Sequence, residues 1–420
     1  MTVESISSYL KNFTMNEISH NSQLFDFEPD NNSKKTELEY YINENTHVPK
    51  YVNEYWTAKQ RQANSLHEIS YRACFKPQLP NFFIKMLSKE GDLILDPFSG
   101  RGTTAIESAL LNRNFIANDI NPLSVILAKP RVNPPTLTEI DERLRDIDFT
   151  NKYDCDIDLS MFYHTNTLNE ILNLKNYFIN KKENEDYIDD WIRMVATNRL
   201  TGHSKGFFSV YTLPPNQSVS PKSQQKINLK KGNVPAYKDV KKIIFDKSSD
   251  LLKDVNTKIR EQLKLVAINS HFYTNDANNL KEIKNESVTL TVTSPPFLNI
   301  VEYAQDNWLR CWFNDINIES VARGIVMAKT TQEWNIFIES VLSELYRVTK
   351  VGGYVAFEVG EINNGKVNLE EFVTEIGIKK GFKCLCIIVN KQDFTKTANI
   401  WGIDNNKKGT NSNRIVLFQK

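Results

Sequence analysis

One short run in the first quarter of the sequence, D-P-F-S-G-R-G-T at 96–103, has the residue types of a ligand-binding turn. Two glycines with one residue between them, at the end of a predicted strand, allow a close approach to a ligand that a Cβ would block. The run lacks the further x-x-G of the dinucleotide fingerprint and the G-K-[ST] of a P-loop. It therefore predicts a ligand site that differs from both of these phosphate-binding motifs.

Two acids accompany this turn. Asp96 ends the predicted strand before the glycines, and Asp119 ends the next predicted strand. A carboxylate about 20 residues after a glycine turn suits the hydroxyls of a ribose. Asp96, at the strand terminus, could meet a positive charge on the ligand. A ligand with a ribose and a cationic amino-acid tail would fit both acids.

A second run, T-S-P-P-F at 293–297, follows another predicted strand. Two consecutive prolines remove two N–H donors and stiffen the backbone. The carbonyl of Pro295 and the hydroxyl of Ser294 can accept hydrogen bonds from a planar NH2 group, and Phe297 offers a flat face on which a base can stack. Any S-P-P can also be a structural turn. Its position at a strand end, downstream of the glycine turn, favours a catalytic site for an amino group.

Together these two runs resemble the signature motifs of the DNA methyltransferases that modify exocyclic amino groups, N4 of cytosine or N6 of adenine. The resemblance spans most of residues 46–420 and implies S-adenosylmethionine as cofactor. The residues that it implies for cofactor binding are Phe75, Lys76, Pro77, Asp96, Phe98, Gly100, Gly102, Thr103, Asp119 and Asp276. The catalytic residues that it implies are Ser294, Pro295, Pro296 and Phe297. Asp276 departs from the expected order of motifs, because it lies directly ahead of the catalytic run.

The resemblance also implies the reaction, which is direct methyl transfer to a base that has left the DNA stack. Serine at the first catalytic position leans toward cytosine N4, with adenine N6 as the alternative. RNA and protein glutamine remain open as substrates, as does a binding subunit with a decayed site. A C5-cytosine enzyme is set aside, because no Pro-Cys pair occurs in the sequence.

The elements that must position these motifs read as an α/β domain. Strand D-L-I-L-D, the glycine turn, helix T-T-A-I-E-S-A-L-L-N and strand F-I-A-N-D-I form a βαβ unit. Further strands are predicted over S-V-T-L-T-V, Y-V-A-F-E-V, F-K-C-L-C-I-I-V and N-R-I-V-L-F. By resemblance the fold class is the Rossmann-like class I methyltransferase fold, a mostly parallel seven-stranded sheet with helices on both faces.

Between the two motifs the α/β pattern stops, and helices are predicted over 159–177, 188–198 and 248–264. Residues 191–238 contain no Asp or Glu, although the whole chain has a net charge of only +1. Such a local excess of positive charge is typical of a surface that binds phosphates; a solvated basic loop is the alternative. The candidate DNA-binding residues are Arg199, His203, Lys205, Lys222, Lys226, Lys230 and Lys231.

These observations predict four segments. Residues 1–45 form a leader of uncertain order, 46–131 the first part of the methyltransferase domain, 132–264 an inserted target-recognition module, and 265–420 the second part. Five scattered cysteines argue against a disulfide framework and against a zinc site. No secretory signal and no membrane-spanning run are found, so we expect a cytoplasmic protein. The expected partners are double-stranded DNA and a restriction endonuclease that acts on the same site.

Overall fold

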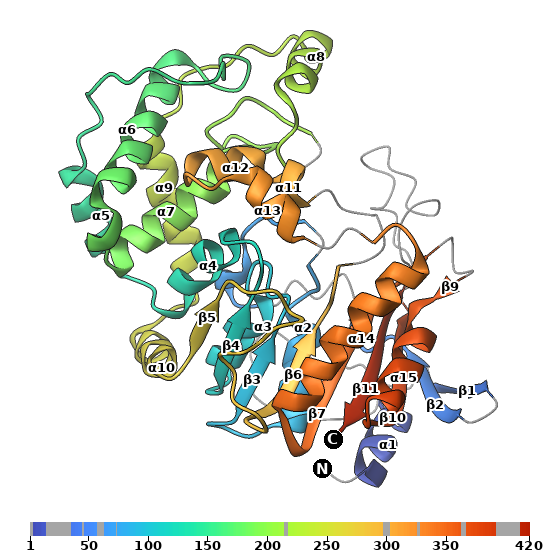
Figure 1. Cartoon of the computed structure of the whole chain (residues 1–420). Helices are drawn as coiled ribbons and strands as arrows, with labels where there is room; N and C mark the ends of the chain where they lie inside the picture. Colours follow the sequence, from blue (N-terminus) through green and yellow to red (C-terminus); the bar gives the residue numbers. More distant parts are fainter. Residues whose placement is uncertain are drawn as a thin grey trace.

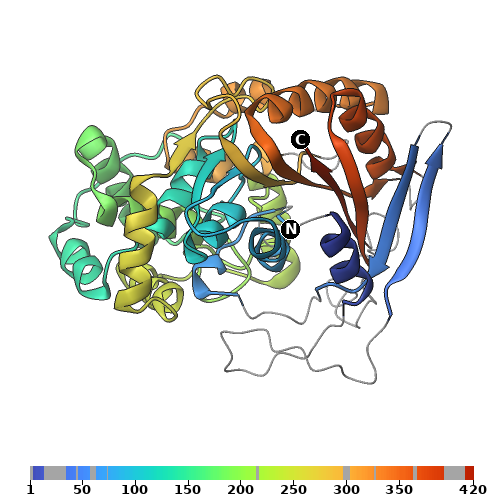
Figure 2. The same ribbon diagram turned by 90° about the horizontal axis from the view of Figure 1, so that it is seen from below.

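A computed structural model describes residues 3–13, 35–43, 46–56, 63–72, 74–213, 217–296, 303–325, 328–362, 367–391 and 412–420. Within these residues a β-sheet covered by helices and a separate module of helices lie side by side (Figure 1). The helical module stands at one end of the sheet, and the hairpin of β1 and β2 stands at the other end (Figure 2). No helix of the described ranges is long and apolar enough to cross a membrane.

The large sheet has nine strands among the described residues, in the order β1-β2-β10-β11-β7-β6-β3-β4-β5. The strands are β1 (Glu37–Asn43), β2 (Thr46–Asn53), β3 (Leu93–Asp96), β4 (Asn114–Asn118), β5 (His271–Tyr273), β6 (Val288–Thr293), β7 (Thr349–Val359), β10 (Lys383–Lys391) and β11 (Ser412–Gln419). From β10 to β5 this is the seven-stranded arrangement of the methyltransferase fold, with β11 antiparallel to both neighbours. The expected fold class is therefore confirmed. A separate two-stranded ribbon pairs β8 (Glu361–Ile362) with β9 (Val367–Asn368).

Apolar side chains alternate between the two faces of the sheet, and each face has its own core. In β7, Val355 and Phe357 pack on one face, while Tyr354 and Ala356 pack on the other. The first face is covered by α14 (Thr331–Val348) and α15 (Leu369–Lys379). The opposite face is covered by α2 (Gln78–Leu87) and α3 (Thr103–Leu110). Burial on both faces explains why these strands read as nearly continuous apolar runs.

The segment between β4 and β5 is helical. It contains α4 (Leu123–Ala128), η2 (Lys129–Val132), α5 (Leu137–Asp146), α6 (Thr165–Lys181), η3 (Lys182–Asn184), α7 (Tyr187–Arg199), α8 (Pro221–Lys231), α9 (Val240–Leu252) and α10 (Thr257–Ile268). Two other helical pieces, α11 (Tyr303–Asp306) and α12 (Trp308–Phe313), follow β6 and pack against this module, with α13 (Ile318–Gly324) beside them (Figure 1).

One sequence expectation in this segment is wrong. Instead of a single helix over 248–264, the structure has α9 and α10 with a break at 253–256. The break arises because Asn256 caps a new helix, with its side chain accepting a hydrogen bond from the Ile259 N–H at 2.9 Å. Helix α10 then continues to Ile268, and β5 begins at His271.

The first 45 residues contribute more to the fold than the sequence suggests. Helix α1 (Val3–Lys11) buries Ile6 and Leu10 in the main core, together with η1 (Ser65–His67) and its buried Leu66. Strand β1 pairs along its whole length with β2, which in turn pairs in parallel with β10. The sheet therefore begins at Glu37, nine positions before the predicted boundary at Thr46 (46 − 37).

Candidate functional site

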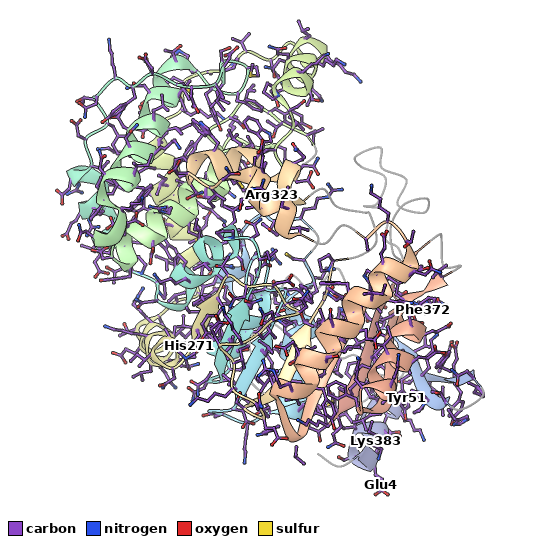
Figure 3. The ribbon with its side chains drawn as sticks, viewed as in Figure 1. Glu4, Tyr51, His271, Arg323, Phe372 and Lys383 are labelled. Carbon is purple, nitrogen blue, oxygen red and sulfur yellow. The ribbon has the colours of Figure 1, made fainter. Side chains whose placement is uncertain are left out.

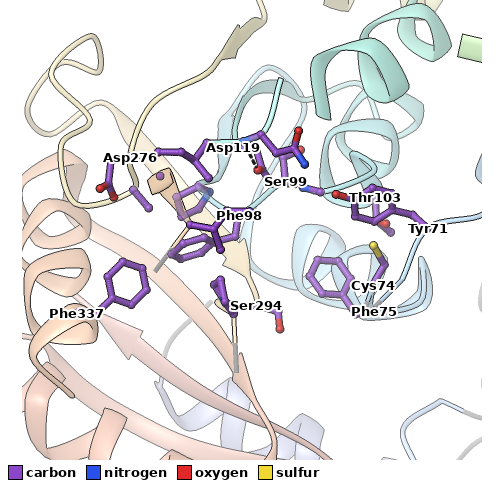
Figure 4. A pocket seen from close by; sticks show the side chains of 18 residues that line it. Tyr71, Cys74, Phe75, Phe98, Ser99, Thr103, Asp119, Asp276, Ser294 and Phe337 are labelled. Carbon is purple, nitrogen blue, oxygen red and sulfur yellow. Dashed lines mark hydrogen bonds between the residues drawn. The ribbon is translucent and has the colours of Figure 1, made fainter. Parts of the chain in front are cut away.

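The carboxyl ends of β3, β4, β5 and β6 meet at one pocket (Figure 4). Parallel α/β sheets bind their ligands at this edge. The pocket encloses about 830 Å³, counting its open mouth. The residues that line it are Tyr71, Cys74, Phe75, Pro97, Phe98, Ser99, Gly100, Thr103, Asp119, Ile120, Asn121, Asp276, Ala277, Ser294, Pro296, Gly324, Ile325 and Phe337. Both sequence motifs thus contribute to a single cavity.

The two glycines of the first motif serve different purposes. Both have positive φ, +52° at Gly100 and +80° at Gly102. Gly100 lines the pocket, where its backbone is open to a ligand. Gly102 does not line it; a Cβ there would lie 2.4 Å from the Cβ of Ala128. Gly102 is therefore needed for the close packing of α3 against α4.

Asp119 is the pocket acid that the sequence assigns to ribose binding. Its carboxylate accepts hydrogen bonds from the Gly100 N–H at 2.8 Å and from the Asn121 N–H at 2.9 Å. Burial raises the pKa of Asp119 to about 6, and these two backbone N–H groups partly oppose that rise. The carboxylate is thus fixed in place and keeps lone pairs that can accept from ligand hydroxyls.

Asp96 lies beneath the glycine turn and is not part of the pocket wall. It is 2% exposed, and its Oδ1 accepts from the Thr293 hydroxyl at 2.6 Å, which ties β3 to β6. Its Oδ2 is buried and has no hydrogen-bond partner among the residues that the structure describes. Burial raises the pKa of Asp96 to about 6. The sequence interpretation of Asp96 as a direct partner of a ligand's cation stays a prediction.

The remaining predicted cofactor residues divide into two groups. Phe75, Phe98, Thr103 and Asp276 line the pocket. Lys76 and Pro77 do not line the pocket. Pro77 is the N-cap residue of α2. Asp276 is positioned by a turn, since its Oδ1 accepts from the Asn278 N–H at 3.1 Å.

These residues fit S-adenosylmethionine. Asp119 offers acceptors for hydroxyl groups, and the buried Asp96 Oδ2 and Ser99 Oγ have no hydrogen-bond partner within the described part of the chain. Ile120 and Ile325 offer apolar surface for a flat ring, and Phe98 meets Phe337 edge-on at 5.9 Å between centroids. The lining is therefore polar where a ribose and an amino-acid tail need partners and apolar where an adenine needs burial.

The second motif reaches the same pocket through Ser294 and Pro296. The Pro296 carbonyl accepts a hydrogen bond from Nε1 of the buried Trp334 at 3.0 Å. Trp334 lies in the first turn of α14, which begins at a capping box formed by Thr330 and Glu333. Helix α14 thereby holds the Pro296 carbonyl in place. Phe297 lies outside the described residues.

Sequence reasoning missed a buried acid beside Ser294. Glu358 on β7 is 4% exposed and accepts a hydrogen bond from the side chain of Asn413. Burial raises the pKa of Glu358 to about 7, and the polar side chains of Asn413 and Ser294 oppose the rise. A single acid inside the apolar run Y-V-A-F-E-V was the available signal, because an unpaired charge is rarely placed in a buried strand without a function.

Sequence reasoning also missed the pocket wall formed by α13. Gly324 and Ile325 at its end line the cavity, and a Cβ on Gly324 would lie 2.9 Å from Cγ1 of Ile120. The neighbouring Arg323 is exposed and lies on the side of α13 between the helical module and the sheet (Figure 3). Helix α13 is far from both motifs in the sequence, so no local pattern indicated that its end lines the pocket.

The candidate DNA-binding residues differ in their exposure. Lys222, Lys226, Lys230 and Lys231 are all exposed on α8, and none of them forms an ion pair with an acid of the described residues. His203 and Lys205 are exposed in the loop after α7. Arg199 is different: it is only 8% exposed, and its guanidinium lies 3.9 Å from the centroid of the Phe207 ring. This burial under Phe207 corrects the expectation that Arg199 belongs to an exposed basic surface.

Comparison with known proteins gives matches to DNA methyltransferases. A family model described as DNA methylase, for N6 and N4 methyltransferases, matches residues 11–129. The chain is 22% identical over 323 residues to type II methyltransferase M.MvaI of Kocuria varians, covering 66% of this chain and 64% of that one. It is 26% identical over 276 residues to type II methyltransferase M.BsoBI of Geobacillus stearothermophilus, covering 58% and 52%. The chain thus spans less than two thirds of the length of either relative.

Among solved structures, a SAM-dependent methyltransferase from Methanosarcina mazei matches 80% of this chain and 96% of its own, at 10% identity and a TM-score of 0.32. That TM-score is too low to bear on fold or function. The sequence matches rest on firmer ground, because the matched range 11–129 includes the glycine turn and Asp119. With both motifs at one pocket, the chain is similar to DNA methylases over residues 11–129 and, more widely, to type II methyltransferases.

Proposed function

We propose that this protein transfers a methyl group from S-adenosylmethionine to the exocyclic N4 of cytosine within a short sequence of duplex DNA. One observation carries the proposal: Ser294 and Pro296 line the same pocket as Gly100 and Asp119. A site for an amino group and a site for a ribose-bearing ligand thus share one cavity. Such a cavity can align a nitrogen lone pair with a methyl donor, and alignment alone accounts for much of the acceleration of such a transfer.

The residues of the second motif orient the base. The Ser294 hydroxyl oxygen and the Pro295 carbonyl accept the two hydrogens of the amino group, so its lone pair points away from them. The bond from Trp334 to the Pro296 carbonyl keeps the tetrapeptide in this shape. Bound S-adenosylmethionine supplies an electrophilic methyl on a sulfonium. Positive charge that develops on the nitrogen is stabilised by the same two acceptors.

Duplex DNA as the substrate is supported by the surface charge and by the relatives. The four exposed lysines of α8 offer cationic partners for phosphates, on the module that overhangs the carboxyl edge of the sheet (Figure 1). Exposed Arg323 beside the pocket adds a further cation. The relatives named above are type II methyltransferases, which supports a restriction endonuclease with the same target as a partner of this protein.

The test is transfer of labelled methyl to unmethylated genomic DNA, followed by digestion to nucleosides and mass spectrometry. N4-methylcytosine is the expected product. N6-methyladenine would preserve the reaction and overturn the base. No labelled nucleoside, with the cofactor bound, would overturn DNA as the substrate, and RNA and protein glutamine would be tried next. The Ser294→Ala variant is the matched control, because it leaves Asp119 and the glycine turn intact.

A further inference from the structure

Glu358 is a buried acid that the proposed function does not yet use. It lies on β7. The residue before it, Phe357, is paired with Thr293 at the end of β6. The register of the sheet therefore puts Glu358 level with Ser294, the next residue after Thr293. The Ser294 side chain favours the ionised form of Glu358, which lowers the pKa of its carboxyl. Strand pairing thus makes the two residues neighbours on adjacent strands.

The other neighbours of Glu358 hold its carboxyl in one orientation. Strand β11 provides Asn413, whose amide Nδ2 donates to Oε1 of Glu358. From β3, Asp96 is the charged group of the described residues that acts on Glu358 electrostatically, and it repels the ionised form. No cation of the described residues is paired with Glu358. An acid so placed, 4% exposed and facing a second buried acid, can change its protonation near neutral pH.

From this arrangement we infer that Glu358 sets the direction of the Ser294 hydroxyl and receives, through it, the proton that the amino group loses. This inference rests on the proposed function. When Glu358 is ionised, it can only accept, so the Ser294 hydroxyl must donate to it. The lone pairs of Ser294 Oγ then face the pocket as acceptors for an amino hydrogen. When Glu358 is protonated it can donate to Ser294 Oγ, and the serine hydrogen is free to turn toward the amino group, where it would repel the amino hydrogens.

The proton balance follows from the same geometry. The base nitrogen uses its lone pair to form the new N–C bond, and the electrons of the broken C–S bond stay on sulfur. The nitrogen is left with one proton in excess. That proton passes to Ser294 Oγ while the serine's own proton passes to the Glu358 carboxylate. The products are a neutral methylated amine, an unchanged serine and a protonated Glu358, which later releases its proton to water.

The first experiment compares Glu358→Gln with Glu370→Gln by single-turnover methylation across pH. Glu370 is a matched control because it is also a buried acid of the same sheet domain, but it pairs with Lys50 and Arg414 away from the pocket. With Oε1 held by Asn413, the glutamine would present its NH2 to Ser294 as a donor. We expect Glu358→Gln to lose at least about a hundredfold in rate and to lose the rise in rate with pH near 7. Cofactor affinity should stay unchanged.

A second measurement does not depend on activity. Infrared difference spectra of the wild type should show a carboxyl band that titrates near pH 7, is absent in Glu358→Gln, and shifts to higher pH in Ser294→Ala, because that variant lacks a donor to the ionised form. If wild-type protein methylates DNA but Glu358→Gln keeps its rate and pH profile, the inference is overturned and the proposed function stands. If the wild type methylates no DNA but the band titrates and depends on Ser294, the proposed function falls and the coupled pair remains. A band with the same pH midpoint in the wild type and in Ser294→Ala would refute the coupling between Ser294 and Glu358.

Discussion

The pocket and the basic surface of α8 handle charge in opposite ways. In the pocket, the acids Asp96, Asp119 and Glu358 are desolvated, and each has its pKa raised by burial. On α8, four exposed lysines form no ion pairs among the described residues. Buried groups act through fixed position, whereas exposed charges act through number and mobility. Substitutions in the pocket should therefore each act on their own, whereas substitutions on α8 should have cumulative, salt-dependent effects.

The largest effect is expected at Ser294. Ser294→Ala should lower the single-turnover rate by about 10²–10³-fold, the range found when one hydrogen-bonding group is removed from a catalytic site. The affinity for S-adenosylmethionine, measured by calorimetry, should change little, because Asp119 and Gly100 are untouched. An equal loss of cofactor affinity would show that Ser294 also contributes to cofactor binding.

Removing the charges of α8 should produce a graded effect on DNA binding. Alanine at Lys222, Lys226, Lys230 and Lys231 removes up to four phosphate contacts. Between 50 and 200 mM salt, the affinity of the variant for DNA should change up to about a hundredfold less than that of the wild type. Fluorescence anisotropy with labelled duplex measures both slopes. Alanine at the exposed Lys258 and Lys264 of α10 serves as the control, and equal slopes in both variants would contradict a role for α8.

A smaller effect is expected at Asp119. Asp119→Ala removes hydrogen bonds from a carboxylate to ligand hydroxyls and should weaken cofactor binding by about 1.5–3 kcal/mol. Asp119→Asn keeps the side-chain shape and should lose less. Calorimetry on the free protein gives both values. Unchanged affinity in both variants would remove Asp119 from the cofactor site.

The smallest effect is the pH dependence of cofactor binding in the wild type. Burial raises the pKa of Asp119 to about 6, and the ionised form is the better acceptor for hydroxyls. As pH falls through 6, the carboxylate gains its proton and affinity should drop, by about tenfold per pH unit at most. The Asp119→Asn variant should lack this drop. A wild-type affinity that stays flat from pH 7 to 5 would mean that ionised Asp119 is not required.

The raised pKa of Glu358 should also make the free energy of unfolding depend on pH. Its folded-state pKa, about 7, lies above the usual value of 4.5, so the folded protein binds the proton more tightly than the unfolded chain. Stability is therefore lost as pH rises from about 4.5 to 7, by up to about 3 kcal/mol. Relative to the wild type, Glu358→Gln should become more stable as pH rises through this window. Denaturant unfolding at pH 5 and pH 8 measures the difference.

Sequence reasoning predicted the parts of the fold and of the site that follow from local sequence pattern. Strand ends marked by Asp96, Asp119 and Ser294 predicted the carboxyl edge, because parallel strands bring their ends together. Glu358 and Trp334 were missed because their contacts with the second motif span 64 and 38 positions and depend on strand register and helix packing (358 − 294 and 334 − 296). Arg199 was misjudged because its charge does not reveal the Phe207 ring above it.

The place at which the helical module joins the sheet has an evolutionary consequence. The chain leaves for the module after β4 and returns through α10 to β5, a strand of three residues at the edge of the sheet. The strand pairs of the pocket floor, from β4 to β7, are made by residues that lie outside the module. Substitutions on the exposed sides of the module's helices can therefore accumulate without altering a strand pair of the pocket floor.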